Sequence, residues 1–276
     1  MTEGMKRMIY FLIMMSGFLF LGLFLVVRYL EGTAIFFPSK QITLTPDRVG
    51  LAFEDLYLTT PDGININAWL LKNTAAKATL IYAHGNAGAM SDRLMKIKYF
   101  HDLGLNVIVF DYRGFGKSQG KPNEQGVYLD ALTVFDYLKT RGEFNKIPVI
   151  AYGASMGGVV AVDLATKRPV DILVVDSSIT SGLEVARRLY PYLPSFLITI
   201  RFDSLTKVKT LSIPKLFIHS PQDKVIAYEM GRRLYEAAQA PKEFIKSSGG
   251  HNEIQIVSDH ATSQAFTQYL KSQGVL

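Results

Sequence analysis

The chain has no cysteine among its 276 residues. Disulfide bonds, catalysis by a thiol and zinc sites built from cysteine are therefore excluded. A His-Glu-x-x-His pattern is absent as well, and no comparable cluster of histidine and carboxylate residues takes its place. The sequence therefore predicts no metal site.

Charged residues are scattered, and a long stretch of one sign is missing. The formal net charge is +6, yet the chain has no run of lysine and arginine and no nucleic-acid-binding motif. We therefore expect no nucleic-acid partner. A basic surface suits a position near anionic lipid headgroups instead. Internal repeats, low-complexity tracts and Ser/Pro-rich linkers are also absent, which is typical of one sizeable domain with a short appendage.

One long apolar segment lies near the start of the chain. About twenty residues, Met8 to Val27, carry no charge, which is enough to cross a bilayer core of about 30 Å as a helix. Lys6 and Arg7 precede this segment, so the positive-inside rule mildly favours a cytoplasmic N-terminus with the rest of the chain on the other side. A cleaved signal peptide is the alternative. Because the run exceeds the usual length of roughly 7 to 15 residues and Arg28 to Glu31 offers no small-x-small cleavage site, we favour an uncleaved single-pass anchor.

A serine between two glycines follows a short apolar segment in the middle of the chain. Residues Val149 to Ala154 have the pattern of a buried strand, and Ser155 lies between Gly153 and Gly157. Glycine has no Cβ, so backbone can approach backbone in the tight strand-to-helix turn that presents such a hydroxyl. The apolar residues from Val159 to Ala165 continue as a helix, whose N-terminal amides favour a developing negative charge. Ser155 is therefore a candidate nucleophile.

Small residues follow an earlier strand. Ala78 to Ala83 is predicted to be that strand, and it leads into His84-Gly85-Asn86-Ala87-Gly88, a turn of the kind that forms an oxyanion loop. In that arrangement one oxyanion donor is the amide after the nucleophile, here Met156, and the other comes from this loop, with the Asn86 amide as the candidate. Both donors are main-chain groups. We expect the His84 side chain to brace the loop rather than to act as a base.

An acid and a base follow further along the chain. Asp223 comes just after the predicted strand Lys215 to His219, and His251 lies on a glycine-rich loop after the predicted strand Glu243 to Lys246. Asp176, at the end of another strand, is the alternative acid. The chain order Ser155, Asp223, His251 is the order of the α/β-hydrolase fold.

The chain resembles the α/β-hydrolase superfamily, and within it is similar to small membrane-associated serine hydrolases that include eukaryotic protein depalmitoylases and many bacterial proteins. The resemblance extends from about residue 50 to the C-terminus. It rests on these motifs in this order: His84–Gly88, Asp111–Ser118, Gly153–Gly158, Asp223 and Gly250–Asn252. The resemblance implies a triad of Ser155, Asp223 and His251, and it favours Asp223 over Asp176 because Asp223 follows the later strand.

The fold implied is a mostly parallel sheet with helices on both faces and a short cap, preceded by one transmembrane helix. We expect an anchor over residues 1–30 with its span at about 8–27, a connecting segment at 31–50, and a hydrolase domain at 51–276 whose cap covers about 177–212. Phe53 to Thr60 and Ile64 to Leu71 are expected to form an antiparallel edge. The other expected elements are a helix at Ser91–Leu103, a strand at Asn106–Phe110, a helix at Gly126–Thr140, a strand at Leu173–Asp176 and a C-terminal helix from about Ser258.

These features predict a membrane-anchored serine hydrolase that cleaves an acyl ester or thioester through an acyl-enzyme intermediate, with no cofactor. The substrate class expected is a lipid or an acylated protein, because an anchor accompanies the apolar cap. Two alternatives remain open: a peptidase or amidase with the same triad, and a non-catalytic membrane-bound interaction protein of this fold.

Overall fold

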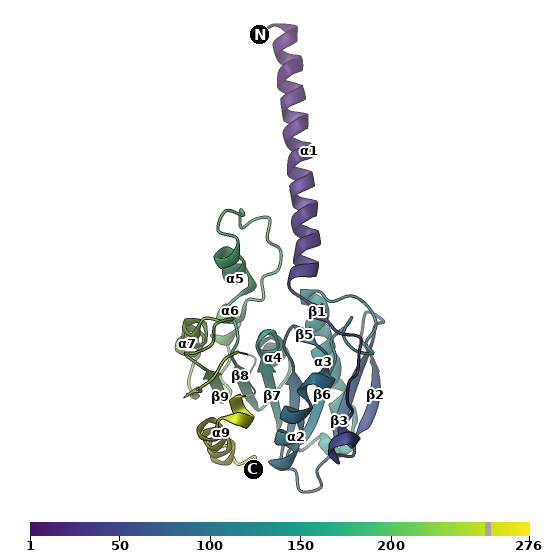
Figure 1. Ribbon diagram of the computed structural model, residues 1–276, viewed down its shortest axis with the longest axis vertical. Helices are drawn as coiled ribbons and strands as arrows, with labels where there is room; N and C mark the ends of the chain where they lie inside the picture. The colour runs from purple at the N-terminus through teal and green to yellow at the C-terminus, as the bar shows by residue number, and fades with distance from the viewer. Residues whose placement is uncertain (252–254) are drawn as a thin grey trace.

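One long helix projects from a layered body of strands and helices in the computed structural model, which describes residues 1–251 and 255–276 (Figure 1). The α-helices are α1 (Glu3–Ala34), α2 (Leu94–Asp102), α3 (Glu124–Thr140), α4 (Met156–Lys167), α5 (Gly182–Leu189), α6 (Ser204–Val208), α7 (Tyr228–Ala237), α8 (Gln255–Ser258) and α9 (His260–Ser272). The strands are β1 (Phe37–Pro38), β2 (Glu54–Thr59), β3 (Asn65–Leu71), β4 (Thr79–Ala83), β5 (Ala87–Gly88), β6 (Asn106–Phe110), β7 (Val149–Ala154), β8 (Ile172–Asp176), β9 (Lys215–His219) and β10 (Lys242–Lys246). Short 3-10 helices lie at Pro46–Val49, Met90–Arg93 and Gly142–Phe144.

The central sheet has eight strands in the order β10-β9-β8-β7-β4-β6-β3-β2. Neighbouring strands pair in parallel, except that β3 runs antiparallel to both β2 and β6. The mostly parallel sheet and the antiparallel pair at its edge are therefore confirmed. Parallel strands need crossover helices, which explains why helices and strands alternate along the chain.

Side chains alternate between the two faces of the sheet, and helices cover both. In β4, Ile81 belongs to the core cluster that includes residues of α3, α4 and α7, whereas Tyr82 belongs to the cluster under α2 and α9. On that second face the ring of Phe100 from α2 meets the ring of Tyr152 from β7, with centroids 4.8 Å apart. Burial on both faces is the physical reason why the central strands are almost continuously apolar in sequence.

The turn between β7 and α4 requires glycine at two positions. A Cβ on Gly153 would overlap the Gly157 carbonyl group, and a Cβ on Gly157 would overlap the Ala83 carbonyl group at the end of β4. These clashes involve backbone atoms, which cannot move aside without separating strand from helix. The two glycines therefore allow β4, β7 and α4 to meet where the serine is presented.

The lower part of α1 is tied to residues 177–212, the cap segment. The Glu31 carboxylate accepts hydrogen bonds from the Thr199 amide at 2.5 Å and from the Thr199 hydroxyl at 2.6 Å. Further up the helix, the ring of Phe20 stacks on the ring of Phe196 with centroids 6.1 Å apart. The rest of α1 extends away from the sheet (Figure 1) and is long and apolar enough to span a membrane.

The sequence does not predict α5 and α6, which lie in the cap segment. Helix α5 has an N-cap signal, because the Ser181 hydroxyl accepts a hydrogen bond from the Glu184 amide at 3.1 Å. The helix has only eight residues, however, which is shorter than the length at which a sequence pattern favours a helix.

Gly153→Ala is expected to destabilise the fold, because the added methyl group overlaps the backbone of Gly157. We expect the free energy of unfolding to fall by about 3 kcal/mol, seen as a lower urea midpoint of the detergent-solubilised protein. Gly142→Ala is the matched control, since nothing lies within 4 Å of a Cβ at that position. Equal midpoints for the two variants would contradict this account of the turn.

Candidate active site

Ser155 occupies the turn between β7 and α4 in a strained backbone conformation. Its φ is 55° and its ψ is −123°, which residues other than glycine rarely adopt. The conformation is held from both sides. The Ser155 amide donates to the Asp176 carbonyl oxygen at 2.8 Å, and the Ser155 carbonyl oxygen accepts from the Ser178 hydroxyl at 2.7 Å. These bonds fix the turn that the Gly-x-Ser-x-Gly pattern predicts.

His251 lies between Ser155 and Asp223. Its Nε2 is 3.0 Å from the Ser155 Oγ, and its Nδ1 is 2.6 Å from the Asp223 Oδ2. The three residues follow β7, β9 and β10, strands that run in the same direction in one sheet. The structure therefore brings together the three side chains that the sequence indicates, within the reach needed between a nucleophile, a base and an orienting acid.

The environment of Asp223 keeps its side chain ionised. Burial opposes the charge, but hydrogen bonds from His219, His251 and the Ile226 amide outweigh it and hold the pKa of the Asp223 carboxyl below its ordinary value. Its Oδ1 accepts from the amides of Val225 and Ile226 at 2.9 and 2.8 Å, while its Oδ2 faces His251. Because the carboxylate is charged at neutral pH, it can hold the imidazole with a proton on Nδ1.

The oxyanion loop, residues His84–Gly88, lies against the nucleophile. A Cβ placed on Gly85 would be 3.6 Å from the Cβ of Ser155. Met156 is the first residue of α4, so its amide has no partner within the helix. The oxyanion loop, which carries the Asn86 amide, and the Met156 amide thus both border Ser155. That these two amides are the oxyanion donors stays a prediction.

The Asn86 side chain joins the oxyanion loop to the segment that follows α1. Its amide group donates to the Ile35 carbonyl oxygen at 2.7 Å. Its own backbone carbonyl accepts from the Phe37 amide at 2.8 Å, and the Ser39 amide donates to the Gly88 carbonyl oxygen at 2.9 Å. Strands β1 and β5 pair in parallel at this point. The segment that leaves the long helix is therefore also a support of the oxyanion loop.

His84 braces the same loop from within. Its side chain is buried, its Nδ1 is 2.7 Å from the Gly85 carbonyl oxygen, and its ring lies 4.6 Å from the Tyr112 ring. The Tyr112 hydroxyl donates to the His84 carbonyl oxygen at 2.7 Å. These contacts agree with the structural role expected for His84.

Asp176, the alternative acid, ends β8 beside the serine turn, but its carboxylate is paired elsewhere. It accepts hydrogen bonds from the Lys96 ammonium at 2.9 Å and from the Tyr152 hydroxyl. Burial opposes the charge on Asp176, but Lys96 outweighs it and keeps the pKa of this carboxyl below its ordinary value. The sequence alone does not reveal the role of Lys96, because a lysine on an amphipathic helix is normally exposed. The two acids therefore have different partners: Asp176 pairs with Lys96, and Asp223 pairs with His251.

A pocket of about 1210 Å³ opens over Ser155. The body of the fold, the cap segment and α1 all contribute to its walls, which are largely apolar. Those from the body and the cap segment include Met156, Ile179, Val185, Leu189 and Phe202. Helix α1 contributes Leu23, Val26 and Val27. Within residues 1–251 and 255–276, no group of three or more His, Cys, Asp or Glu side chains is placed to bind a metal ion.

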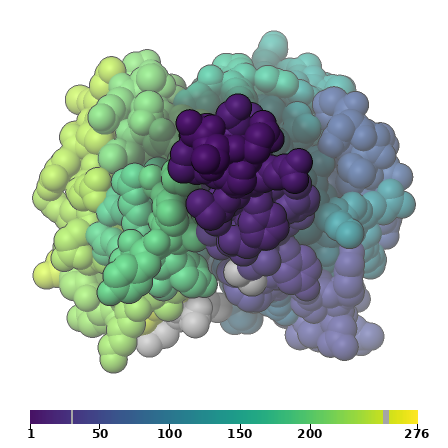
Figure 2. Space-filling view, turned by 90° about the horizontal axis from the view of Figure 1, so that it is seen from above, coloured from purple at the N-terminus to yellow at the C-terminus, as the bar shows by residue number. Residues whose placement is uncertain are grey.

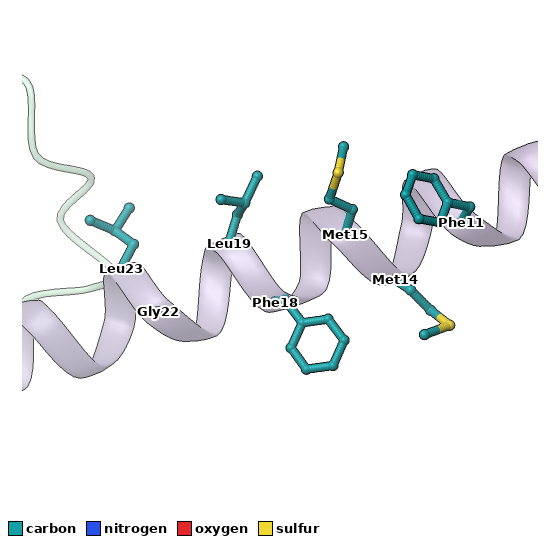
Figure 3. Close-up of a pocket in the computed structure, with 7 residues that line it drawn as sticks. All are labelled: Phe11, Met14, Met15, Phe18, Leu19, Gly22 and Leu23. Carbon is teal, nitrogen blue, oxygen red and sulfur yellow. The ribbon is translucent and has the colours of Figure 1, made fainter.

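A second hollow, of about 500 Å³, lies on α1 itself. Figure 3 shows its lining on one stretch of helix, with Phe18 and Met14 on one side and Leu19 and Leu23 on the other. None of the lining side chains has a titratable or nucleophilic group. The hollow is therefore a feature of the apolar helix surface and not a second reaction centre.

Comparisons with known proteins show which family the chain is similar to. A family model described as Hydrolase_4, serine aminopeptidase S33, matches residues 74–182, which include the oxyanion loop and the serine turn. An uncharacterised protein, Rv2307c of Mycobacterium tuberculosis, is 30% identical, and the match covers 92% of each chain. The lysophosphatidylserine lipase ABHD12 of Macaca fascicularis is 36% identical over 62% of this chain and 48% of its own length.

Comparison with a solved structure supports the fold. The esterase Pf2001 of Pyrococcus furiosus superposes with a TM-score of 0.72 at 22% identity, covering 86% of this chain and 98% of that one. At this level of identity the likeness shows the shared α/β-hydrolase fold and nothing of the substrate.

Asp223→Asn is expected to lower kcat/KM by about 10³- to 10⁴-fold, because a neutral amide leaves the His251 imidazole in the wrong tautomer. The measurement is ester hydrolysis by the detergent-solubilised protein, with circular dichroism as a check on folding. Asp176→Asn is the matched control. It breaks the pair with Lys96 and lowers the melting temperature, but the folded protein keeps its rate. Loss of activity in folded Asp176→Asn with retention in Asp223→Asn would reverse the assignment.

Asn86→Ala is expected to lower kcat by roughly 10- to 100-fold with little change in KM, because the oxyanion loop loses its bond to Ile35 but keeps its backbone amide. Asn73→Ala is the control, since Asn73 also donates a side-chain bond to a backbone carbonyl, that of His101 at 3.1 Å, but not in the oxyanion loop. An unchanged kcat in Asn86→Ala would show that the bond to Ile35 does not position the loop.

Proposed function

We propose that this chain, which belongs to the α/β-hydrolase superfamily and is a serine hydrolase, cleaves an acyl ester or thioester that has a long acyl chain. The observation that carries the proposal is the series of hydrogen bonds from Asp223 through His251 to Ser155, at 2.6 and 3.0 Å, beneath a largely apolar pocket. The series supplies an acid, a base and a nucleophile. The pocket supplies a surface that an acyl chain can cover.

In the proposed reaction, His251 takes the proton from the Ser155 hydroxyl as its oxygen attacks the acyl carbon. Asp223 holds the Nδ1 proton and stabilises the imidazolium that forms. The amides of Asn86 and Met156 receive the oxyanion. The leaving alcohol or thiol takes the proton from His251, and a water activated by the same imidazole then releases the acyl group from the serine. These steps require no cofactor.

A lipid ester is the substrate that we favour. The pocket of about 1210 Å³ has room for a long acyl chain. Cationic Arg93 and Lys224 also line it, which suits an anionic headgroup. The name of the macaque relative, a lysophosphatidylserine lipase, describes such an ester. An acylated protein presents the same acyl carbon and remains within the proposed class.

Helix α1 is proposed to be a single-pass membrane anchor. Its sequence is apolar over a length that spans a bilayer, and its lower end is part of the pocket wall. Lys6 and Arg7 near its start support a cytoplasmic N-terminus, which puts the hydrolase domain on the non-cytoplasmic side.

Hydrolysis of an amide is the second candidate. The matching family model is described as a serine aminopeptidase, and the same three side chains can attack an amide carbonyl. An aminoacyl amide assayed beside the esters separates the two candidates.

We expect kcat/KM for p-nitrophenyl esters to rise from acetate towards long chains, by up to about fourfold per methylene group while the pocket still buries it. Ser155→Ala is the blank for each substrate and is expected to lose several orders of magnitude in turnover. A fluorophosphonate is expected to label the wild-type chain and not this variant. A preference for acetate would reject the long-chain substrate, and unchanged turnover in Ser155→Ala would reject the mechanism.

A further inference from the structure

The tip of the cap segment, residues 189–196, exposes large apolar side chains beside α1. The exposed fractions are 54% for Tyr190, 97% for Tyr192 and 67% for Phe196. Figure 2, which looks along α1 from above, shows the green cap segment next to the purple helix. Exposed apolar groups gathered in this way are typical of a surface that contacts a membrane or another protein.

Helix α1 sets the level of this tip. Phe196 stacks on Phe20, with ring centroids 6.1 Å apart. Phe20 belongs to the charge-free run from Met8 to Val27, and it lies about 10 Å before the end of that run at 1.5 Å per residue. With α1 across a bilayer, the Phe196 ring therefore lies at the level of the apolar part of the anchor.

The cap segment is fastened to α1 below that level. The Glu31 carboxylate binds the Thr199 amide and hydroxyl at 2.5 and 2.6 Å and the Ile200 amide at 3.2 Å. Arg28 pairs with the same carboxylate at 3.2 Å. Since these bonds join the two segments, they fix the position of the tip along α1.

The chemistry of the tip suits the interfacial layer of a membrane. Pro191 and Pro194 have no amide proton, so the loop has fewer donors to satisfy than an ordinary loop. The Leu193 amide donates to the Tyr190 carbonyl oxygen and the Leu197 amide to the Pro194 carbonyl oxygen, each at 3.0 Å. Such internal bonds lower the free energy needed to place irregular backbone near hydrocarbon. Tyrosine, which the tip carries twice, is enriched at membrane interfaces.

Cations precede the tip in α5, which lies nearer to the sheet than the tip does (Figure 1). Arg187 and Arg188 are exposed in the last turn of α5, and Arg188 pairs with Glu184 at 3.1 Å. Long cationic side chains keep their apolar stems beside hydrocarbon and their charges in the headgroup layer.

We propose that the tip of the cap segment dips into the same bilayer leaflet as α1, and that the pocket takes acyl chains from that leaflet between the two. Val26 and Val27 of α1 line one side of the pocket, and Leu189 and Leu193 of the cap segment also line it. The substrate is then a membrane-resident lipid whose ester group stays near the headgroups while its chain lies along α1. The choice of substrate rests on the proposed function, whereas the membrane contact of the tip does not.

Fluorescence quenching tests the membrane contact without any need for activity. The chain has a single tryptophan, Trp69, which is fully buried and gives a constant background. The full chain with Tyr192→Trp is reconstituted in vesicles of phosphatidylcholine brominated on its acyl chains. Emission is expected to fall relative to unbrominated vesicles. The matched control is Tyr57→Trp, at an exposed position on β2, and its added emission is expected not to fall.

The absence of bromine quenching at position 192 would overturn the proposal. A blue-shifted emission in vesicles that is insensitive to bromine would do the same, since it would place a protein surface and not lipid on the tip.

Hydrolysis in the same vesicles tests the delivery of substrate. Tyr192→Asp is expected to lower hydrolysis of a vesicle-borne long-chain ester by about tenfold, because a charge opposes entry of the tip, and to leave soluble p-nitrophenyl butyrate unaffected. Tyr57→Asp is the matched control and is expected to affect neither substrate. Tyr192 does not line the pocket, so its loss leaves the site intact.

Equal rates for wild type and Tyr192→Asp on the vesicle-borne ester, or equal loss on both substrates, would overturn the delivery of lipid by the tip. Failure of the proposed function gives a different result, namely butyrate hydrolysis that survives in Ser155→Ala, and this result is independent of the quenching.

Discussion

The strained backbone at Ser155 is the constraint on which the rest of the site depends. A residue with φ of 55° keeps that conformation only if its neighbours compensate for the strain. Here the compensation comes from the hydrogen bond of the Ser155 amide to the Asp176 carbonyl oxygen and from that of the Ser178 hydroxyl to the Ser155 carbonyl oxygen. Two glycines also let the strands and the helix meet. The parallel sheet supplies these partners because β7 lies between β4 and β8. The strand order of the sheet is therefore what allows the Ser155 hydroxyl to be presented.

The same sheet gives two buried carboxylates different partners. Asp176 ends β8 and Asp223 follows the neighbouring parallel strand β9, so the chain offers two aspartates of the kind that a triad uses. Lys96 reaches one of them from α2 and neutralises its charge, whereas backbone amides, His219 and His251 surround the other. Only a carboxylate that lacks a cation of its own leaves its charge available to an imidazolium.

The features that the sequence predicts well are local. The bounds expected for the strand Asn106–Phe110 agree with the structure, and the positions of the serine turn and of the loop after β4 could be read from short motifs. What the sequence does not reveal depends on residues far apart in the chain: the burial of Lys96, the bond of Glu31 to the cap segment and the support of Asn86 by the segment after α1. Nothing within a window of ten or twenty residues distinguishes such a lysine or glutamate from one in solvent. The domain limits and the roles of the site residues remain predictions.

The contacts of α1 argue against a passive tether. A tether needs only length and hydrophobicity, and its sequence near the domain is free to vary and to move. Helix α1 instead contributes Val26 and Val27 to the pocket and Glu31 to the cap segment, and the chain just after it pairs with the oxyanion loop. Removal of the helix would open one wall of the pocket to water and release the cap segment at the same time. It follows that one element, α1, forms both a wall of the pocket and the attachment of the cap segment, so we expect a protein without α1 to have an altered reaction centre.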